Sequence, residues 1–167
     1  MCAIGSQNAK TNDLADALRH VLADVFAVTA LAYLSKWNIQ QTAPPEVIEH
    51  VAHVHKAAQR GQTVIARQLW ALGRPVSLHS SDPAHVPRWM LAGQSVDPVS
   101  ELLLLTSGLT EVSASISAAI EVARDVPAPQ AMAVLRRLLR NQTRWVRILR
   151  EDAESLLHAD GAKGTLH

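Results

Sequence analysis

The chain has 167 residues, of which 48% are hydrophobic and 4% aromatic, and its formal net charge at pH 7 is +1. This length suits one domain with a single sizeable core. The near-neutral charge supplies no global field of the kind that marks nucleic-acid or membrane binders. Glycine and proline are few, which favours long helices. The only cysteine, Cys2, excludes a disulfide framework and indicates a reducing compartment.

No secretory signal is visible in residues 1–10, and we expect no membrane-spanning segment in the first predicted helix. Residues 1–10 lack the apolar core of a secretory signal, and the longest uncharged run of the first predicted helix, residues 25–35, is too short to span a bilayer. We therefore expect a soluble, cytoplasmic protein with no membrane partner. Residues 1–10 and 159–167 are predicted to be flexible tails of a bundle domain over residues 11–158.

The first predicted helix covers residues 11–38 and is apolar over a wide arc. Its main stripe contains Leu14, Leu18, Val21, Val25, Val28 and Ala32. A second stripe beside it contains Leu22, Phe26, Thr29 and Tyr33. A helix with so wide an apolar surface needs burial on two sides. We expect one side to contact a neighbouring subunit; a central position in a monomeric bundle is the alternative.

The second predicted helix begins at Pro44-Pro45 and ends at Leu72, before Gly73. Gly61 lies inside it at a cost of about 1 kcal/mol relative to alanine, and marks a close helix contact or has no special role. Residues 74–96 form a long linker broken by prolines. This linker has room for a short helix over residues 84–91 that carries Trp89.

The third predicted helix opens with Asp97-Pro98, which is typical of an N-cap followed by proline in the first turn. It continues to about Arg124, and a tight turn over residues 125–128 leads to the fourth helix. A largely apolar stripe of the fourth helix follows at three- and four-residue steps: Met132, Leu135, Leu139, Gln142, Val146, Leu149, Ala153 and Leu156.

The lengths of the connections predict an all-α, ferritin-like four-helix bundle. Short turns join the first helix to the second and the third to the fourth, so each pair is an antiparallel hairpin. A 27-residue helix is about 40 Å long, and the extended linker is long enough to cross it. Two hairpins joined by one long crossover are typical of ferritin-like bundles.

Several stretches resemble the Dps family of miniferritins, the DNA-binding ferritin-like proteins of starved cells. These stretches are residues 22–24 (Leu-Ala-Asp), 36–38 (Lys-Trp-Asn), 64–73 (Val-Ile-Ala-Arg-Gln-Leu-Trp-Ala-Leu-Gly) and Arg144-Trp145. Their order and separations agree with the family over most of residues 14–156. The resemblance implies a homo-oligomeric, dodecameric shell that oxidises Fe(II) and stores iron.

The resemblance also implies where an iron site would lie, but the ligands there are replaced. In the family, one subunit contributes two histidines and its neighbour contributes an aspartate and a glutamate. These positions fall on Lys36, Ile48, Thr63 and Arg67. Charged lysine and arginine repel a divalent cation, and isoleucine offers no ligand atom. We therefore expect the usual ferroxidase centre to be absent, which leaves iron binding open.

A second group of residues offers other metal ligands. Glu46, His50 and His53 lie on one helix at three- and four-residue spacing, so they share a face. They form either a transition-metal site or a solvated face with local ion pairs. Asp24 is the only acidic residue between His20 and Lys36. It is either the remnant of an iron-entry carboxylate or a partner for Arg67 or another arginine across an interface.

The fourth helix is rich in arginine. Four residues form a stripe away from the apolar seam: Arg136, Arg140, Arg144 and Arg147. Three interpretations remain open: pairing with acidic residues of the same helix, pairing with neighbouring subunits, or binding of phosphate groups such as those of DNA. The tails offer only Lys10 and Lys163, so strong DNA binding through basic tails is not expected.

Three functions are consistent with these observations. The first is a Dps-like shell subunit for iron sequestration or stress protection, without the usual ferroxidase centre. The second is an active miniferritin whose ligands include Glu46, His50 and His53. The third is a helical module that binds DNA or a protein partner. Assembly with a catalytically complete paralogue is compatible with the first.

Overall fold

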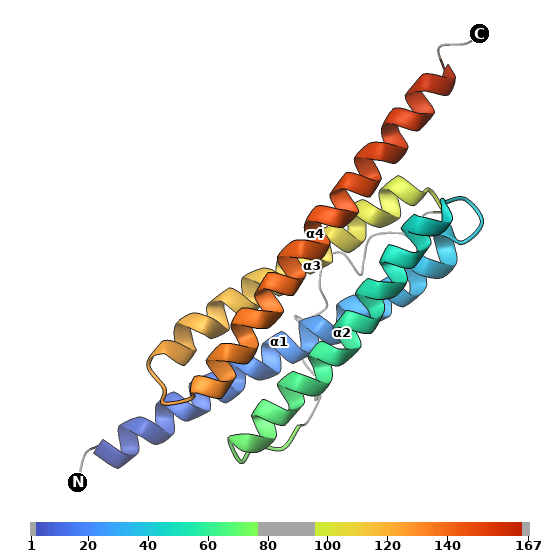
Figure 1. Cartoon of the computed structure of the whole chain (residues 1–167). Coiled ribbons are helices and arrows are strands. Elements are labelled where there is room, and N and C mark those ends of the chain that lie inside the picture. The colour runs from blue at the N-terminus through green and yellow to red at the C-terminus, as the bar shows by residue number, and fades with distance from the viewer. Residues whose placement is uncertain (1–2, 77–95, 165–167) are drawn as a thin grey trace.

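A computed structural model of the chain describes residues 3–76 and 96–164, which form four long α-helices (Figure 1). Helix α1 spans Ala3–Ile39, α2 spans Pro45–Ala71, α3 spans Pro98–Arg124 and α4 spans Pro129–Gly164. The described part of the chain therefore has the predicted all-α, four-helix architecture. Helices α2 and α3 also begin and end within one residue of their expected bounds.

The first and last helices, α1 and α4, are longer than predicted. The segment expected to be a tail over residues 1–10 is helical from Ala3, and the segment expected to be a tail from residue 159 is helical to Gly164. Both segments contain alanines and no proline. The backbone can therefore continue the helix, and only the weak penalty of glycine opposes it.

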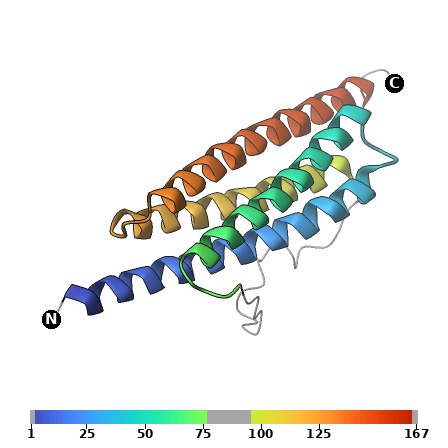
Figure 2. The same ribbon diagram turned by 60° about the horizontal axis from the view of Figure 1, so that its bottom comes forward.

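The helices are arranged as two antiparallel hairpins (Figures 1 and 2). Helices α1 and α4 run in one direction, and α2 and α3 run in the other. Helix α1 packs against α2 and α3, and α4 packs against α3 and, less extensively, against α2. The core between them contains large, fully buried aliphatic side chains, among them Leu14, Leu18, Leu22, Ile65, Leu69, Leu102, Leu105, Leu109, Ile116, Leu135 and Leu149.

Two hydrogen bonds show that the connection between α2 and α3 crosses the bundle. At one end, the Arg74 guanidinium donates to the side-chain oxygen of Asn12. At the other end, the Thr42 hydroxyl donates to the carbonyl oxygen of Val96 at 3.2 Å. The intervening length of α1 is about 40 Å. The long crossover is therefore confirmed, while the short helix predicted over residues 84–91 lies outside the described residues.

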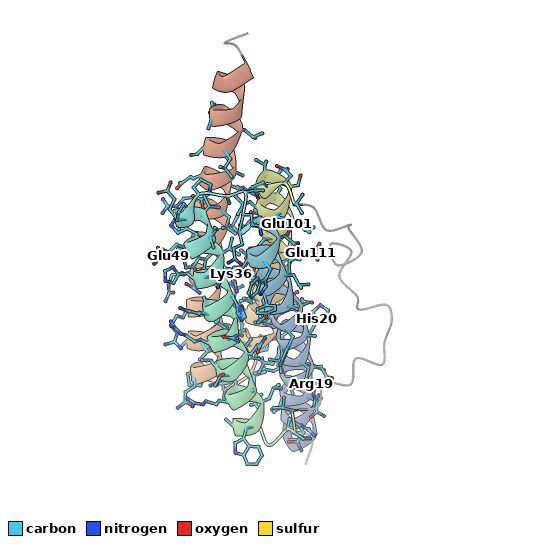
Figure 3. All side chains as sticks on the ribbon, turned by 90° about the vertical axis from the view of Figure 1, so that its right-hand side faces the viewer. Arg19, His20, Lys36, Glu49, Glu101 and Glu111 are labelled. Atoms are coloured by element: carbon cyan, nitrogen blue, oxygen red, sulfur yellow. The ribbon has the colours of Figure 1, made fainter. Side chains whose placement is uncertain are left out.

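Polar contacts set the register of the helices. The Asn38 amide donates to Glu101 Oε1 at 3.2 Å, which joins the end of α1 to the start of α3. Glu101 is only 1% exposed, so this carboxylate is part of the bundle interior (Figure 3). The Gln62 amide donates to the Thr29 hydroxyl at 2.6 Å, which joins α2 to α1. Buried polar groups with specific partners favour one register over others.

Gly61 lies where three helices approach one another. A Cβ atom at this position would lie 3.5 Å from Leu138 Cδ2 of α4 and 3.6 Å from Val25 Cγ1 of α1. These are ordinary van der Waals distances, but a longer side chain would have to displace both neighbours. Gly61 is therefore buried at a helix contact where an alanine would also fit.

Asp97 caps α3 as predicted. Its carboxylate accepts hydrogen bonds from the Ser100 hydroxyl at 2.6 Å and from the Ser100 backbone N–H at 2.9 Å. These two bonds, the hydroxyl first, hold the pKa of Asp97 below its ordinary value. Such a cap satisfies one of the free backbone donors of the first turn.

Two helical segments are long and apolar enough to cross a bilayer by length and composition: Asn8–Ile39 and Pro98–Arg124. The length of the uncharged run over residues 25–35 underestimates the first segment, because a spanning helix tolerates an occasional charge. In this bundle both helices supply core residues, and core helices of water-soluble bundles meet the same criterion. Less than half of each apolar window is buried within one chain, so a large apolar surface remains outside.

Candidate functional site

The outer surface of α1 and α2 carries exposed aromatic side chains. Phe26, Tyr33 and Trp37 of α1 are 39%, 50% and 56% exposed, at spacings that keep them on one side of the helix. We call this surface, together with Lys36 of α1 and His55 of α2, the outer α1–α2 face. Of the second stripe predicted on the first helix, Phe26 and Tyr33 are exposed, whereas Leu22 is buried in the core and Thr29 is partly buried.

Tyr33 is the centre of an aromatic cluster on this face. Its ring meets Trp37 edge to face, with centroids 6.3 Å apart and planes at 71°. It meets His55 in the same way, at 5.6 Å and 74°. Edge-to-face pairs of this kind have favourable quadrupole interactions. The cluster therefore holds half-exposed rings in fixed orientations across α1 and α2.

The outer α1–α2 face has a positive local field. Partial burial lowers the pKa of His55 below its ordinary value, and the nearby charges of Lys36 and Lys56 lower it further. Lys36 lies on α1 beside α2 (Figure 3). A field that disfavours a protonated imidazole also disfavours a divalent cation at the same place.

The lowered pKa of His55 predicts a loss of stability in acid. Between its native pKa and about 6.5, the unfolded chain binds more protons than the native chain, so stability falls as the pH decreases through this window. The substitution His55→Gln should make the urea midpoint less dependent on pH between about 7.5 and 5. The matched control is His158→Gln, which removes an exposed imidazole from α4. Equal pH dependence in wild type and His55→Gln would contradict the assignment.

One chain does not bring the four substituted iron-site positions together. Lys36 is half-buried on α1, and Ile48 is half-buried against the core on α2. Thr63 and Arg67 are exposed on α2, and the Thr63 hydroxyl donates to the Gln59 carbonyl at 3.3 Å. Ile48 and Arg67 are separated by about 28 Å of helix. Any site that uses both ends of α2 would need a second subunit.

The three residues of the second metal candidate, Glu46, His50 and His53, do not share one set of contacts. His50 Nδ1 lies 2.8 Å from Asp152 Oδ2 of α4, and the side chains are 37% and 16% exposed. The His53 ring stacks on Trp145, with centroids 6.2 Å apart and planes at 21°. Glu46 is exposed. No group of three metal-binding side chains is found among the described residues. The partners Asp152 and Trp145 were not identified from sequence, because the register of α2 against α4 is a tertiary property.

Asp24 has partners within its own chain. Its carboxylate accepts a hydrogen bond from the Ser115 hydroxyl of α3 and lies 3.6 Å from His20 Nε2. The sequence suggests instead an arginine partner across an interface or an iron-entry role. The observed contacts give Asp24 a structural role between α1 and α3.

The arginine stripe of α4 is exposed along its whole length. Of the pairs expected within the helix, Arg147 Nε lies 3.9 Å from Glu151 Oε1, and both side chains are largely solvated. Such a pair contributes little stability. The Arg144 guanidinium lies over the Trp145 ring, 5.7 Å from its centroid. Ion pairing within α4 therefore involves only a small part of the arginine stripe.

Neither family models nor curated proteins give a match to this chain. Solved structures do. A DPS protein from Vibrio cholerae O1, described as a member of a broad superfamily of ferritin-like diiron-carboxylate proteins, is similar at a TM-score of 0.76 and 19% identity, over 86% of this chain and 90% of that one.

Two further solved structures are similar. A dodecameric thioferritin, the bacterioferritin-related protein from Bacteroides fragilis, has a TM-score of 0.73 and 13% identity, over 94% of this chain and 92% of that one. A mutant of the Dps1 protein from Mycobacterium smegmatis has a TM-score of 0.73 and 16% identity, over 86% of this chain and 96% of that one. At these identities the likeness establishes the fold. The chain has the ferritin-like four-helix-bundle fold of the Dps proteins.

Proposed function

We propose that this chain is the subunit of a cytoplasmic, Dps-like homo-oligomeric shell that sequesters iron or protects against stress without the usual ferroxidase reaction. The fold supports a Dps-like shell subunit, since the similar structures include Dps proteins and a dodecameric thioferritin. The residues of the outer α1–α2 face support the lack of the usual ferroxidase reaction. Iron in this proposal is cargo, bound by groups other than the usual ligand set.

The observation that carries the proposal is the placement of the Lys36 charge beside His55 on the outer α1–α2 face. Lys36 occupies the position of the first expected histidine, and its charge contributes to the lowered pKa of His55. Across a subunit contact, Arg67, at the position of the expected glutamate, would add a second cation in place of a carboxylate. A site of this composition repels Fe(II), whereas imidazole and carboxylate ligands would attract it.

The exposed aromatic cluster supports association of subunits. Large half-exposed aromatic side chains are typical anchors of protein interfaces. Contact between two outer α1–α2 faces would bury Phe26, Tyr33 and Trp37 and would also bring Lys36 near the second subunit. A dodecamer is the closed assembly that we propose, by analogy with the thioferritin.

Two further partners belong to this proposal. A catalytically complete paralogue in a mixed shell would supply the ligands that this chain lacks. DNA is a second partner, for which the exposed arginines of α4 supply cationic groups. Phosphate contacts of this type are independent of base sequence and weaken with salt.

The alternative is an active miniferritin that uses Glu46, His50 and His53. The close contact of His50 with Asp152 favours it to the extent that a histidine and a carboxylate, two iron-ligand types, lie together. The third hypothesis, a helical interaction module, differs from the other two in the size of the assembly that it predicts. Its native mass would be that of a small complex, whereas a twelve-subunit shell has about twelve times the chain mass of 18.1 kDa.

The decisive test is Fe(II) oxidation by oxygen and by peroxide, followed spectroscopically with purified protein and with buffer alone. The proposal predicts equal rates, because the replaced ligands leave no open coordination site for the metal. Acceleration by the protein would contradict it. If that acceleration is lost in the double variant His50→Ala/His53→Ala, the alternative site is established.

A further inference from the structure

Helices α2 and α4 run in opposite directions along one side of the bundle (Figures 1 and 2). We call the line along which they meet the α2–α4 seam. Two contacts fix its register. The His53 ring stacks on Trp145, and about two turns further along α2, Gly61 lies beside Leu138. Because both contacts have the same register, they show which residues of α2 and α4 lie level across the seam.

Cations border this seam on both helices. On α2, Arg60 follows His53 by seven residues, which is about two helical turns, so both residues lie on the same side of α2. On α4, the Arg144 guanidinium lies over the Trp145 ring, 5.7 Å from its centroid. Further steps of one or two turns along each helix complete the group. We call these six residues the α2–α4 basic surface: Lys56, Arg60, Arg67, Arg137, Arg140 and Arg144.

The α2–α4 basic surface has no carboxylates of its own. No aspartate or glutamate occurs in residues 51–72 or 129–150. All six cations are exposed, and none of them forms an ion pair in the described part of the chain. The register also places like charges nearly level across the seam, as with Arg60 and Arg140. Such charges repel one another, so an anion that lies between them is favoured.

We propose that the α2–α4 basic surface binds inorganic polyphosphate, a linear chain of phosphate groups, along the seam between its two rows of cations. From Lys56 to Arg67 the surface extends over about 17 Å, which is enough for several phosphate groups in succession. A chain in this position meets cations from both helices. Guanidinium groups match the geometry of phosphate oxygens, and such contacts weaken as salt screens them.

The seam fits a bare phosphate chain better than a nucleic acid. Each nucleotide brings a base, and proteins that hold single strands provide exposed aromatic rings on which the bases stack. Among the described residues of the seam, the indole of Trp145 is already stacked with His53 and covered by Arg144. The exposed ring of Trp70 lies beyond the last cation of the surface. The surface therefore supplies charge to the phosphates but no free ring to the bases.

Calorimetric titration of the full chain with inorganic polyphosphate of defined length, in low salt, tests the proposal. Two variants each remove part of one row of cations: Lys56→Gln/Arg60→Gln on α2, and Arg137→Gln/Arg144→Gln on α4. Each should weaken binding about tenfold or more, because two of the six cations are lost. Both rows should matter equally. Since all four side chains are exposed, circular dichroism should show unchanged helical content.

The matched control is Arg136→Gln/Arg150→Gln, which removes the same charge from the side of α4 that faces away from α2. Arg136 precedes Trp145 by two and a half turns, and Arg150 follows it by nearly one and a half. The control should bind polyphosphate as the wild type does. Repeating the series in the Tyr33→Glu/Trp37→Glu background keeps the surface accessible if a shell encloses it. The outcome is then independent of the proposed assembly.

Three results would overturn the proposal. The first is an absence of polyphosphate binding in low salt. The second is equal binding by all variants, or a loss in the control as large as in the row variants. The third is tighter binding of a single-stranded oligonucleotide with the same number of phosphates, which would assign the surface to nucleic acid. A loss confined to the α4 variant would contradict binding along the seam.

Discussion

Restoring the four expected iron ligands should give this chain Fe(II) oxidation above background. The variant is Lys36→His/Ile48→His/Thr63→Asp/Arg67→Glu. It removes two cations and supplies two imidazoles and two carboxylates, the ligand types that bind Fe(II) and leave positions open for an oxidant. We expect oxidation of Fe(II) to be about tenfold or more faster than with the wild-type chain, a change in the range that metal-site substitutions produce.

The control for this gain is Lys36→Ala/Ile48→Ala/Thr63→Ala/Arg67→Ala, which removes the cations without adding ligands. Thr63 and Arg67 are exposed, so changes there should be tolerated, whereas Ile48 packs against the core and its loss will cost some stability. Thermal unfolding of both variants shows whether the bundle is kept. A folded restored variant that oxidises Fe(II) no faster than the alanine variant would show that these positions do not form a site.

Helix boundaries were predictable where the sequence contains a local signal. Pro44-Pro45 and Gly73 delimit α2, and Asp97-Pro98 starts α3, because each of these residues acts on its own backbone. The predicted start of α1 lies eight residues too late, since Ala3–Lys10 contains neither a stop signal nor an apolar stripe. Segments of that kind are helical or not depending on weak propensities, which sequence inspection does not resolve.

The sequence predicted which residues are candidates for the site, but not which side chains they contact. The placement of Lys36 and Arg67 at the positions of expected ligands follows from the family resemblance and stays a prediction. The pairing of His50 with Asp152, about one hundred residues away, depends on how α2 and α4 align, and no spacing rule contains that register. The same holds for Asp24 and Ser115. Local periodicity indicates which face a residue occupies, whereas its partner is set by the packing of other helices.

Introducing charge into the outer α1–α2 face should separate the subunits. In the double variant Tyr33→Glu/Trp37→Glu, two half-exposed aromatic anchors become carboxylates. Loss of a central aromatic anchor typically costs about 2 kcal/mol or more, and two like charges facing their copies across a two-fold axis add repulsion, so association through this face should weaken by roughly a hundredfold or more. Sedimentation velocity as a function of concentration measures the change.

The same number of charges placed elsewhere separates an interface effect from a general one. Leu103→Glu/Ser107→Glu adds two glutamates to exposed positions of α3 and should leave association through the outer α1–α2 face intact. Both variants should keep their helical content, since all four positions are exposed at the bundle surface. If Tyr33→Glu/Trp37→Glu has the assembled mass of the wild type, subunits do not meet at this face. The charge of Lys36 beside His55 would then face solvent, and any effect of it on iron binding would have to be explained within a single subunit.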